Sequence, residues 1–356
     1  MSISRREFLG TAALAGLAAG PLAADDGKTT LPTRVLGKTG QRVSILGFGG
    51  GSRYYLAYKE EDQAFAAITR ALDLGITYID TADDYGGHLS EQRIGKAIKG
   101  RRKGLFLVSK VTPRSGDAAQ RAMELTLKSL DVDYLDLLHI HQLAGEDDLA
   151  QVEAKGNALD QLLKFRDQKM TRFIGITSHA DPAALKTALE RHDFDCTQMA
   201  LNAGQVAMMD GTGGMVVNQA MKPSFETTAL PVAVRKKMGV LGMKVFAQEA
   251  LVGQATPREL LYYTLSLPVA AAVVGMPKLE LLEEDVRLAR AFQPLPAAEM
   301  QELSGRLSAR NKLALDRFFE RHVDGVAGDV TGVIAQDADP RSFRLRIADD
   351  TLITPS

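Results

Sequence analysis

Cysteine and tryptophan are the residues that this sequence has least of. Its 356 residues include one cysteine, Cys196, and no tryptophan. A single thiol excludes an internal disulfide framework, a cysteine-ligated iron–sulfur cluster and a CxxC redox pair. The absence of tryptophan also excludes a carbohydrate-stacking surface that is rich in indole rings.

Neither sign of charge is in excess. The chain has 43 Lys and Arg against 44 Asp and Glu, which gives a formal net charge of −1. This balance offers no general electrostatic reason to bind nucleic acid or an anionic membrane, so we expect neither as a partner. Hydrophobic residues make up 45% and charged residues 24% of the chain, as in ordinary soluble globular proteins. The length suits one large α/β barrel or two medium domains.

Residues 1–30 read as an export signal and a linker. Ser-Arg-Arg-Glu-Phe-Leu occupies positions 4–9, and an apolar run over 11–24 follows that is too short to span a bilayer. The SRRxFL pattern resembles the twin-arginine export signal, which implies cleavage near Ala23 or Ala24 and a periplasmic or otherwise exported protein. The twin-arginine machinery would then be a partner, and a membrane would be met only in transit. A Sec-type signal or a loose basic helix are the alternatives.

Short apolar runs alternate with longer amphipathic ones beyond the signal. The predicted strands are Val43–Gly47, Ile76–Asp80, Leu105–Ser109, Tyr134–Leu138, Arg172–Ile176, Asp195–Ala200, Val240–Lys244 and Ala270–Val274. The predicted helices are Glu60–Leu74, Ser90–Ile98, Asp117–Leu130, Gly156–Gln168, Pro182–Arg191, Glu226–Lys237, Pro257–Leu267 and Leu279–Ala289. Buried parallel strands read as continuous apolar runs, as most of these do.

Eight βα units predict a (β/α)8 TIM barrel over residues 31–296. A doubly wound sheet is the rival, but no GxGxxG opens the first helix. Arg34–Leu36 and Arg42–Ile45 flank the turn at 37–40, so we expect an N-terminal β-hairpin plug. The loop at 203–225 follows the sixth strand, on the face where such barrels bind substrate.

The last segment, 297–356, is expected to form a C-terminal helical extension and a tail. Ala297–His322 has helical spacing, and Ser342–Ile347 alternates like a half-buried strand. The sequence gives no functional account of this tail.

Polar residues follow several strands at their C-terminal ends, where a (β/α)8 barrel builds its active site. Asp80, Lys110 and His141 each end or follow a strand, and Tyr85 lies in the loop after Asp80. These four side chains are the candidate catalytic residues, because neighbouring strand ends bring them toward one point.

The motifs around these residues resemble those of the aldo-keto reductases. Residues 80–86 read Asp-Thr-Ala-Asp-Asp-Tyr-Gly and are followed by Ser90-Glu91, as in that family's D-T-A-x-x-Y-G signature. Residues 107–110 (LVSK), 133–141 (DYLDLLHIH) and 173–179 (FIGITSH) resemble its third, fourth and fifth strands. The resemblance runs from about residue 34 to about 290.

The resemblance implies a hydride transfer between a nicotinamide cofactor and a carbonyl substrate. Tyr85 would be the general acid, and the Lys110 ammonium would lower its pKa from the usual value near ~10. Asp80 would hold and charge-balance Lys110, and His141 would donate a hydrogen bond to the carbonyl oxygen. His139, two residues earlier, is expected to be a structural, hydrogen-bonded histidine.

The cofactor contacts are also implied by the resemblance. They are Gly49, Gly50, Thr177, Ser178, Gln198, Met243, Lys244, Gly275, Lys278, Glu284 and Asp285. Ser178 replaces the more common Asn, and Asp285 stands where Asn is usual. NADP(H) is the family's usual cofactor. NAD(H) is a live option here, because Leu281 stands in the familiar arginine position and only Lys278 offers a nearby positive charge for a 2′-phosphate.

Three further expectations concern what the protein is not. No set of His, Cys, Asp and Glu has convincing metal-ligand spacing, so no metal is predicted. A binding or regulatory protein that keeps the barrel and cofactor with little turnover is the main alternative to an enzyme. A carboxylate-based barrel hydrolase would need two acids facing one bond, whereas Asp80 is expected to pair with Lys110.

Overall fold

The computed structural model describes residues 30–206, 224–247 and 250–308, together with three short strands nearer the C-terminus. The predicted export signal and most of the 203–225 loop lie outside these ranges. In the described parts of the chain, no helix has both the length and the apolar character needed to cross a membrane.

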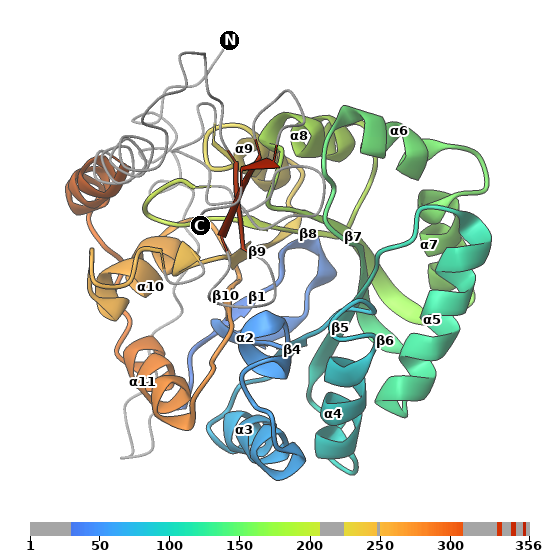
Figure 1. Ribbon diagram of the computed structural model, residues 1–356, viewed down its shortest axis with the longest axis horizontal. Helices are drawn as coiled ribbons and strands as arrows, with labels where there is room; N and C mark the ends of the chain where they lie inside the picture. The colour runs from blue at the N-terminus through green and yellow to red at the C-terminus, as the bar shows by residue number, and fades with distance from the viewer. Residues whose placement is uncertain are drawn as a thin grey trace.

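Eight parallel strands close into a barrel in the order β10-β3-β4-β5-β6-β7-β8-β9 (Figure 1). They are β3 (Leu46–Gly49), β4 (Tyr78–Asp80), β5 (Phe106–Val111), β6 (Leu135–Ile140), β7 (Thr171–Ser178), β8 (Cys196–Ala200), β9 (Gly239–Met243) and β10 (Ala271–Val274). Almost every residue in these strands is buried, which explains why their sequences read as continuous apolar runs. The predicted (β/α)8 barrel is confirmed.

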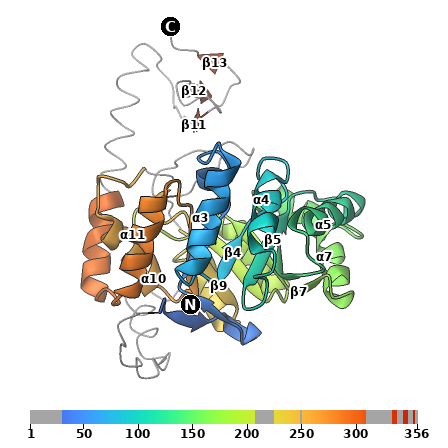
Figure 2. The same ribbon diagram turned by 90° about the horizontal axis from the view of Figure 1, so that it is seen from below.

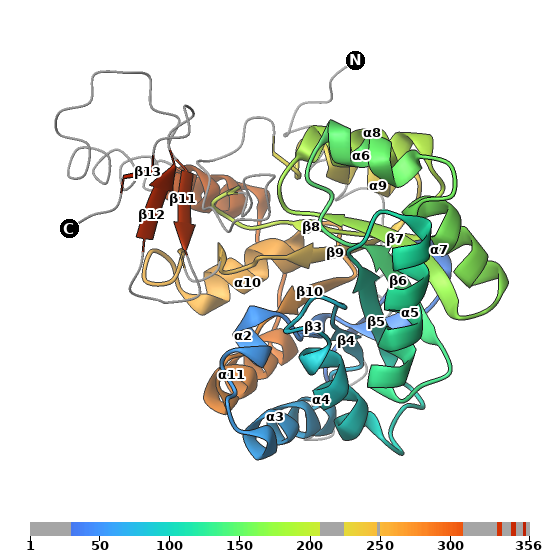
Figure 3. The ribbon, with the colours of Figure 1, turned by 45° about the vertical axis from the view of Figure 1, so that its right-hand side comes forward.

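Helices surround the strands (Figures 1 and 3). They are α2 (Ser52–Tyr55), α3 (Glu61–Asp73), α4 (Leu89–Ile98), α5 (Gly116–Leu130), α6 (Glu146–Glu153), α7 (Ala158–Asp167), α8 (Pro182–Arg191), α9 (Ala229–Arg235), α10 (Pro257–Ser266) and α11 (Leu279–Arg290). The short helices α2 and α6 were not predicted from the sequence. In α3, Ala64, Ala67, Ile68 and Ala71 are fully buried, and this spacing places them on one face against the strands.

A two-stranded hairpin closes the N-terminal end of the barrel (Figure 2, blue). β1 (Thr33–Val35) pairs antiparallel with β2 (Arg42–Ser44) around the 3-10 turn η1 (Gly37–Thr39). The prediction of one strand over Val43–Gly47 is wrong: the chain leaves the hairpin after Ser44, and the first barrel strand begins only at Leu46.

The hairpin is fastened to the barrel by a half-buried arginine and an apolar side chain. Arg34 Nη1 donates to the carbonyl oxygens of Leu265 at 2.9 Å and Val269 at 2.8 Å. The guanidinium carbon of Arg34 lies 5.3 Å from the centre of the Phe292 ring. Leu36 is fully buried. These contacts fill the lower end of the barrel, as a plug.

The C-terminal segment is helical over residues 297–308, where the predicted extension begins. The rest of the predicted Ala297–His322 helix lies outside the described residues. Further on, β11 (Val333–Gln336), β12 (Phe343–Arg346) and β13 (Leu352–Ile353) form a separate antiparallel sheet. The strand predicted over Ser342–Ile347 corresponds to β12.

Candidate active site

Three of the four candidate catalytic residues lie at the same end of the barrel because their strands are parallel neighbours. Asp80 is the last residue of β4, Lys110 is the second-last of β5, and His141 directly follows β6. β4 pairs with β5, and β5 pairs with β6. The loop after β4 adds Tyr85 to the same place.

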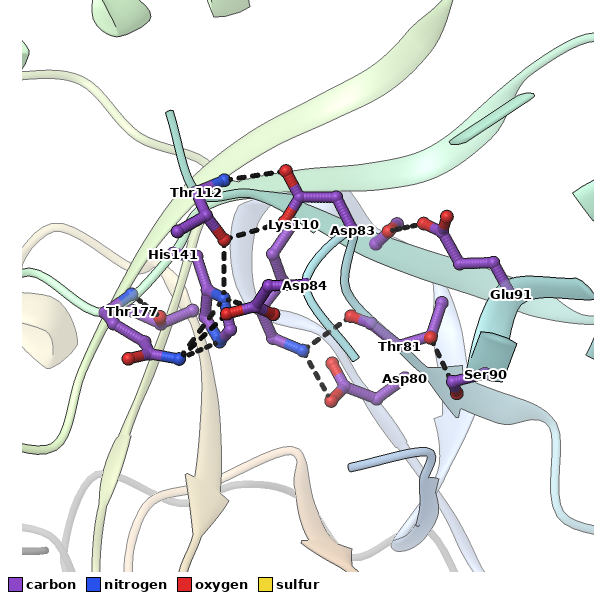
Figure 4. A network of polar contacts seen from close by, with 12 residues as sticks. Asp80, Thr81, Asp83, Asp84, Ser90, Glu91, Lys110, Thr112, His141 and Thr177 are labelled. Carbon is purple, nitrogen blue, oxygen red and sulfur yellow. Dashed lines mark hydrogen bonds and ion pairs between the residues drawn. The ribbon is translucent and has the colours of Figure 1, made fainter. Parts of the chain in front are cut away.

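Lys110 and Asp80 form a buried ion pair (Figure 4). Lys110 Nζ lies 2.7 Å from Asp80 Oδ2 and donates a second hydrogen bond of 2.6 Å to the Thr81 carbonyl oxygen. Their side chains are 1% and 3% exposed. Burial alone would lower the pKa of Lys110, but the charges of Asp80 and Tyr85 and the hydrogen bond that Lys110 donates to Asp80 raise it above its usual value. The lysine is therefore a fixed cation at neutral pH.

Tyr85 lies between this cation and His141. The Lys110 ammonium is 5.0 Å from the centre of the Tyr85 ring, and the rings of Tyr85 and His141 meet edge-on at 5.5 Å. On its other side the Tyr85 ring stacks on Tyr55 of α2 at 6.1 Å. These contacts orient the phenol at this end of the barrel.

The pKa of Tyr85 differs from the expectation. Desolvation raises it to about 12, while the Lys110 charge acts in the opposite direction. Lys110 thus lowers the pKa as predicted, but burial is the larger effect, so a lowered net pKa is wrong for this structure. The phenol stays protonated at neutral pH and is available as a proton donor.

His141 is buried, and polar groups surround its ring (Figure 4). Nδ1 lies 3.2 Å from Asp84 Oδ1 and 3.2 Å from Thr112 Oγ1, and Nε2 lies 3.2 Å from the side-chain amide nitrogen of Gln142. Burial lowers the pKa of His141, partly offset by Asp84. Sequence reasoning missed Asp84, although this second acid stands directly before Tyr85 in the motif.

His139 was expected to be a structural histidine with a hydrogen bond. It is fully buried on β6, but neither ring nitrogen has a hydrogen-bond partner in the structure. Burial and the Lys110 charge lower the pKa of His139 far below its usual value. The expected hydrogen bond is therefore wrong, and the ring is held neutral among its neighbours.

The loops above the strands are tied together by charged side chains. Asp83 accepts hydrogen bonds from the Thr112 amide at 3.0 Å and the Thr112 hydroxyl at 2.6 Å. Arg114 makes two bonds to Asp148, at 2.7 and 2.8 Å, and a third to the His141 carbonyl oxygen at 2.7 Å. This bridging fixes the position of His141 from its backbone side.

Among the described residues, one set of three side chains lies close enough together to be considered as a metal site. Ligand atoms of Asp83, Asp84 and His141 lie within 4.8 Å of one another. Thr112 satisfies Asp83, and His141 and Gln142 contact Asp84, so hydrogen bonds account for this arrangement. The prediction of no metal stays a prediction.

The three residues expected near a nicotinamide carboxamide have different surroundings. Gln198 is 2% exposed, and its Oε1 has no hydrogen-bond partner in the structure. Thr177 Oγ1 accepts a hydrogen bond of 2.9 Å from the backbone amide of Gln142. The Ser178 hydroxyl donates to the Leu143 carbonyl oxygen at 2.7 Å. Ser178 is thus occupied in holding a loop, whereas Gln198 presents an unused acceptor.

Other predicted contacts lie around the same end. A Cβ on Gly50 would come within 2.6 Å of Ser90 Oγ and 2.8 Å of the Asp80 carbonyl oxygen, so only glycine fits there. A Cβ added to Gly49 would likewise approach the backbone of Val274, and one added to Gly275 would approach the Arg53 side chain. Met243 ends β9 with 8% exposure.

Lys244 follows Met243 with a left-handed φ of 60°. Its pKa falls to about 8, mainly through desolvation and also through the positive charges of Lys110 and Arg53. Several positive groups therefore lie near one another at the barrel mouth, which favours a ligand with negative charge.

The remaining predicted contacts lie at the N-cap and in the middle of α11. Lys278 is the N-cap of α11 and is exposed. Glu284 Oε1 lies 3.8 Å from Arg287 Nη2. Asp285 is 5% exposed. Burial raises the pKa of Asp285 to about 7. Leu281 is 39% exposed. The structure thus places Lys278 and Leu281 at the surface and Asp285 inside.

Fold and site together define a (β/α)8 barrel whose mouth holds a tyrosine over a buried Lys–Asp pair. The model of the Aldo/keto reductase family matches residues 46–259. The chain belongs to this family.

Two curated relatives give the level of similarity. The chain is 34% identical over 161 residues to L-galactose dehydrogenase of Arabidopsis thaliana, a match that covers 42% of this chain and 49% of that protein. It is 31% identical over 163 residues to an NADP(+) aldo-keto reductase of Schizosaccharomyces pombe, covering 42% and 46%. The chain thus matches about half the length of each of these relatives.

Solved structures match over more of the chain. The thermostable aldo-keto reductase Tm1743 is 27% identical with a TM-score of 0.61, and the match covers 77% of this chain and 99% of that one. An aldo-keto reductase from Bacillus halodurans is 23% identical with a TM-score of 0.63, covering 78% and 96%. The latter similarity supports the fold alone.

Proposed function

We propose that this protein is a nicotinamide-dependent oxidoreductase acting on a small carbonyl compound: an aldehyde, a ketone or a sugar. The observation that carries the proposal is the convergence of Tyr85, Lys110 and His141 at the barrel mouth, with the Lys110 ammonium 5.0 Å from the Tyr85 ring centre. A phenol over a fixed cation is suited to give up a proton to a nearby oxygen.

Each residue has a chemical role in this proposal. Hydride addition to a carbonyl carbon leaves negative charge on the oxygen, which needs a proton and preorganised hydrogen bonds. Tyr85, protonated at neutral pH because desolvation raises its pKa to about 12, donates the proton. Lys110 then stabilises the phenolate, and Asp80 holds Lys110 in place.

The residues at the mouth fit a dinucleotide. The buried, unpartnered Gln198 Oε1 can accept from a carboxamide, and Lys244 offers a desolvated positive charge for phosphate oxygens. A bound reduced nicotinamide supplies the hydride. The Thr177 hydroxyl accepts from the Gln142 backbone amide and keeps its own proton to donate to the carboxamide oxygen.

NADP(H) is the proposed dinucleotide. One relative is named an NADP(+) enzyme, and an aldo-keto reductase from Klebsiella pneumoniae was solved with NADP and acetate. In this chain Lys278 is the residue available for a 2′-phosphate, while Leu281 offers neither charge nor hydrogen bond. NAD(H) is therefore the alternative to be measured beside it.

A substrate panel tests the activity. Relatives named L-galactose dehydrogenase and methylglyoxal reductase suggest testing hexose oxidation together with methylglyoxal and glyceraldehyde reduction, followed by nicotinamide absorbance. Tyr85→Phe should lower kcat by roughly 10²–10⁴-fold and leave the dinucleotide Kd unchanged. A Phe variant with wild-type kcat would refute the role of Tyr85. Tight dinucleotide binding without turnover on any substrate would instead support the alternative that this chain is a regulatory or binding protein.

We also propose export by the twin-arginine route, on the SRRxFL pattern at residues 4–9. Replacing Arg5 and Arg6 together by Lys should retain the precursor in the cytoplasm. A Sec-type signal needs positive charge but no particular basic residue, so unimpaired export of the double variant would favour that route instead. Cell fractionation of the two precursors gives the answer.

A further inference from the structure

We propose that Asp84 is a positioning residue that sets the tautomer of His141 and thereby the direction of its hydrogen bond to the reacting oxygen. Asp84 holds the ring proton on Nδ1, so Nε2 is an acceptor while the ring is neutral and a donor only when the ring is protonated. This inference deepens the proposed function and rests on it for its kinetic consequence, but not for the tautomer itself.

The two nearest neighbours of Nδ1 are both acceptors, and the Gln142 side-chain amide nitrogen lies further from Nδ1, at 3.5 Å, than from Nε2, at 3.2 Å. Asp84 Oδ1, at 3.2 Å, has no proton to give when it is ionised. Thr112 Oγ1, also at 3.2 Å, has a single proton, which it donates to Asp83 Oδ1 at 2.6 Å. Only a proton on Nδ1 satisfies both contacts.

The neighbour of Nε2 supports the same assignment. The Gln142 side-chain amide nitrogen lies 3.2 Å from His141 Nε2 and 3.3 Å from Asp84 Oδ2. Turning the amide around would face its oxygen to a carboxylate oxygen, so the nitrogen must point this way. An amide N–H directed at Nε2 needs a lone pair there, which only the Nδ1–H tautomer provides while the ring is neutral.

The charges around the ring come from several elements. Asp83, Asp84 and Tyr85 face it from the loop after β4, Lys110 from β5, His139 from β6, and His179 from the residue directly after β7. Burial and Lys110 lower the pKa of His141, and Asp83 and Asp84 act against this.

Asp84 is held as a carboxylate. Its side chain is 35% exposed; partial desolvation alone would raise its pKa, but the hydrogen bond and charge of His141 and the charge of Lys110 lower it. A neutral ring beside a carboxylate is thus the state at neutral pH, with the proton on Nδ1.

The consequence concerns which substrate form the site holds best. When a substrate takes the place of the Gln142 side-chain amide, a neutral His141 accepts at Nε2 from an alcohol hydroxyl, whereas it cannot donate to a carbonyl oxygen. Carbonyl binding gains this hydrogen bond only at pH values low enough to protonate the ring. One hydrogen bond of this kind contributes about 1–1.5 kcal/mol, or roughly tenfold in affinity.

Asp84→Asn gives the sharpest test, because the asparagine amide can donate to Nδ1 and move the ring proton to Nε2. Nitrogen-15 NMR of labelled protein reports the tautomer, and the His141→Gln spectrum assigns the signal. We expect Nδ1–H in the wild type and in Asp84→Glu, and Nε2–H in Asp84→Asn. A wild-type ring with its proton on Nε2, or an unchanged tautomer in Asp84→Asn, would overturn the proposal.

Kinetics provide the second measurement. In the wild type, KM for the carbonyl should rise by about tenfold between the protonated and neutral forms of His141. In Asp84→Asn it should stay flat with pH. Asp133→Asn is the matched control, because it removes the same charge from an exposed position before β6, at the other end of the barrel. A wild-type rise that persists in Asp84→Asn contradicts the proposal, whereas absence of all turnover with the expected NMR result refutes only the proposed function.

Discussion

The Lys110–Asp80 pair, which forms the floor of the site, and helix α11 differ in how far their polar groups are buried and partnered. At the floor, Lys110 and Asp80 are almost fully buried, and the lysine has its charge partner and a backbone acceptor before any ligand arrives. At α11, Lys278 and Leu281 are exposed, and Asp285 is a buried acid with a raised pKa. The floor is fixed by the barrel itself, whereas the α11 end depends on what binds there.

Lys110→Met should produce the largest effect, because it removes the buried Lys110–Asp80 ion pair. It leaves Asp80 buried without its partner, which should cost about 3–5 kcal/mol in the free energy of unfolding. Denaturant unfolding at pH 7 measures this loss. The pH–rate profile should also change, because Lys110 lowers the pKa of Tyr85. Asp80→Asn should be milder, since Lys110 keeps its bond to Thr81. Equal stability of wild type and Lys110→Met would contradict the ion pair's importance.

Asp285→Asn should have the next largest effect, and its sign depends on pH. Burial raises the folded-state pKa of Asp285 to about 7, above an unfolded value near ~3.9. The folded state therefore holds the proton more tightly, and stability falls as pH rises from about 4 to about 7. The Asn variant lacks this loss and should be more stable at pH 8, by at most roughly 4 kcal/mol. Thermal unfolding at pH 4 and pH 8 measures the difference. A variant destabilised equally at both pH values would show that Asp285 is ionised in the folded protein.

Lys278→Ala should have the smallest effect, confined to one dinucleotide. Loss of one exposed cation should weaken NADPH binding by up to about tenfold, or about 1.4 kcal/mol, and leave NADH nearly unchanged. Glu283 is expected to interfere little with a phosphate, because Arg70 pairs with it at 2.7 Å. The wild-type preference between NADPH and NADH should stay below ~100-fold. Titration of both dinucleotides by fluorescence checks this, and equal losses for both would place the phosphate elsewhere.

The sequence predicts the barrel and the convergence of Asp80, Lys110 and His141 for a simple reason. Their places follow from continuous apolar strands that end in a polar residue, and parallel strand ends meet at one face. The pKa of Tyr85 could not be predicted, because its desolvation depends on packing between α2 and the β4 loop.

Hydrogen-bond partners were equally beyond a reading of the sequence. Ser178 stands in a motif position associated with cofactor binding, yet its hydroxyl is bonded to the Leu143 carbonyl oxygen in a neighbouring loop. Asp84 contacts His141 only because the β4 loop folds over β6. Such contacts join loops whose shapes no local pattern determines.

The hairpin plug has a consequence for how the protein could diverge. Arg34 and Leu36 stabilise the barrel from the end opposite the reacting groups. Substitutions in α2 or in the loops above β5 and β6 can then alter the mouth while this anchorage remains. Selection for a new substrate could proceed there without first weakening the scaffold, because folding stability and chemical preference are drawn from opposite ends of one molecule.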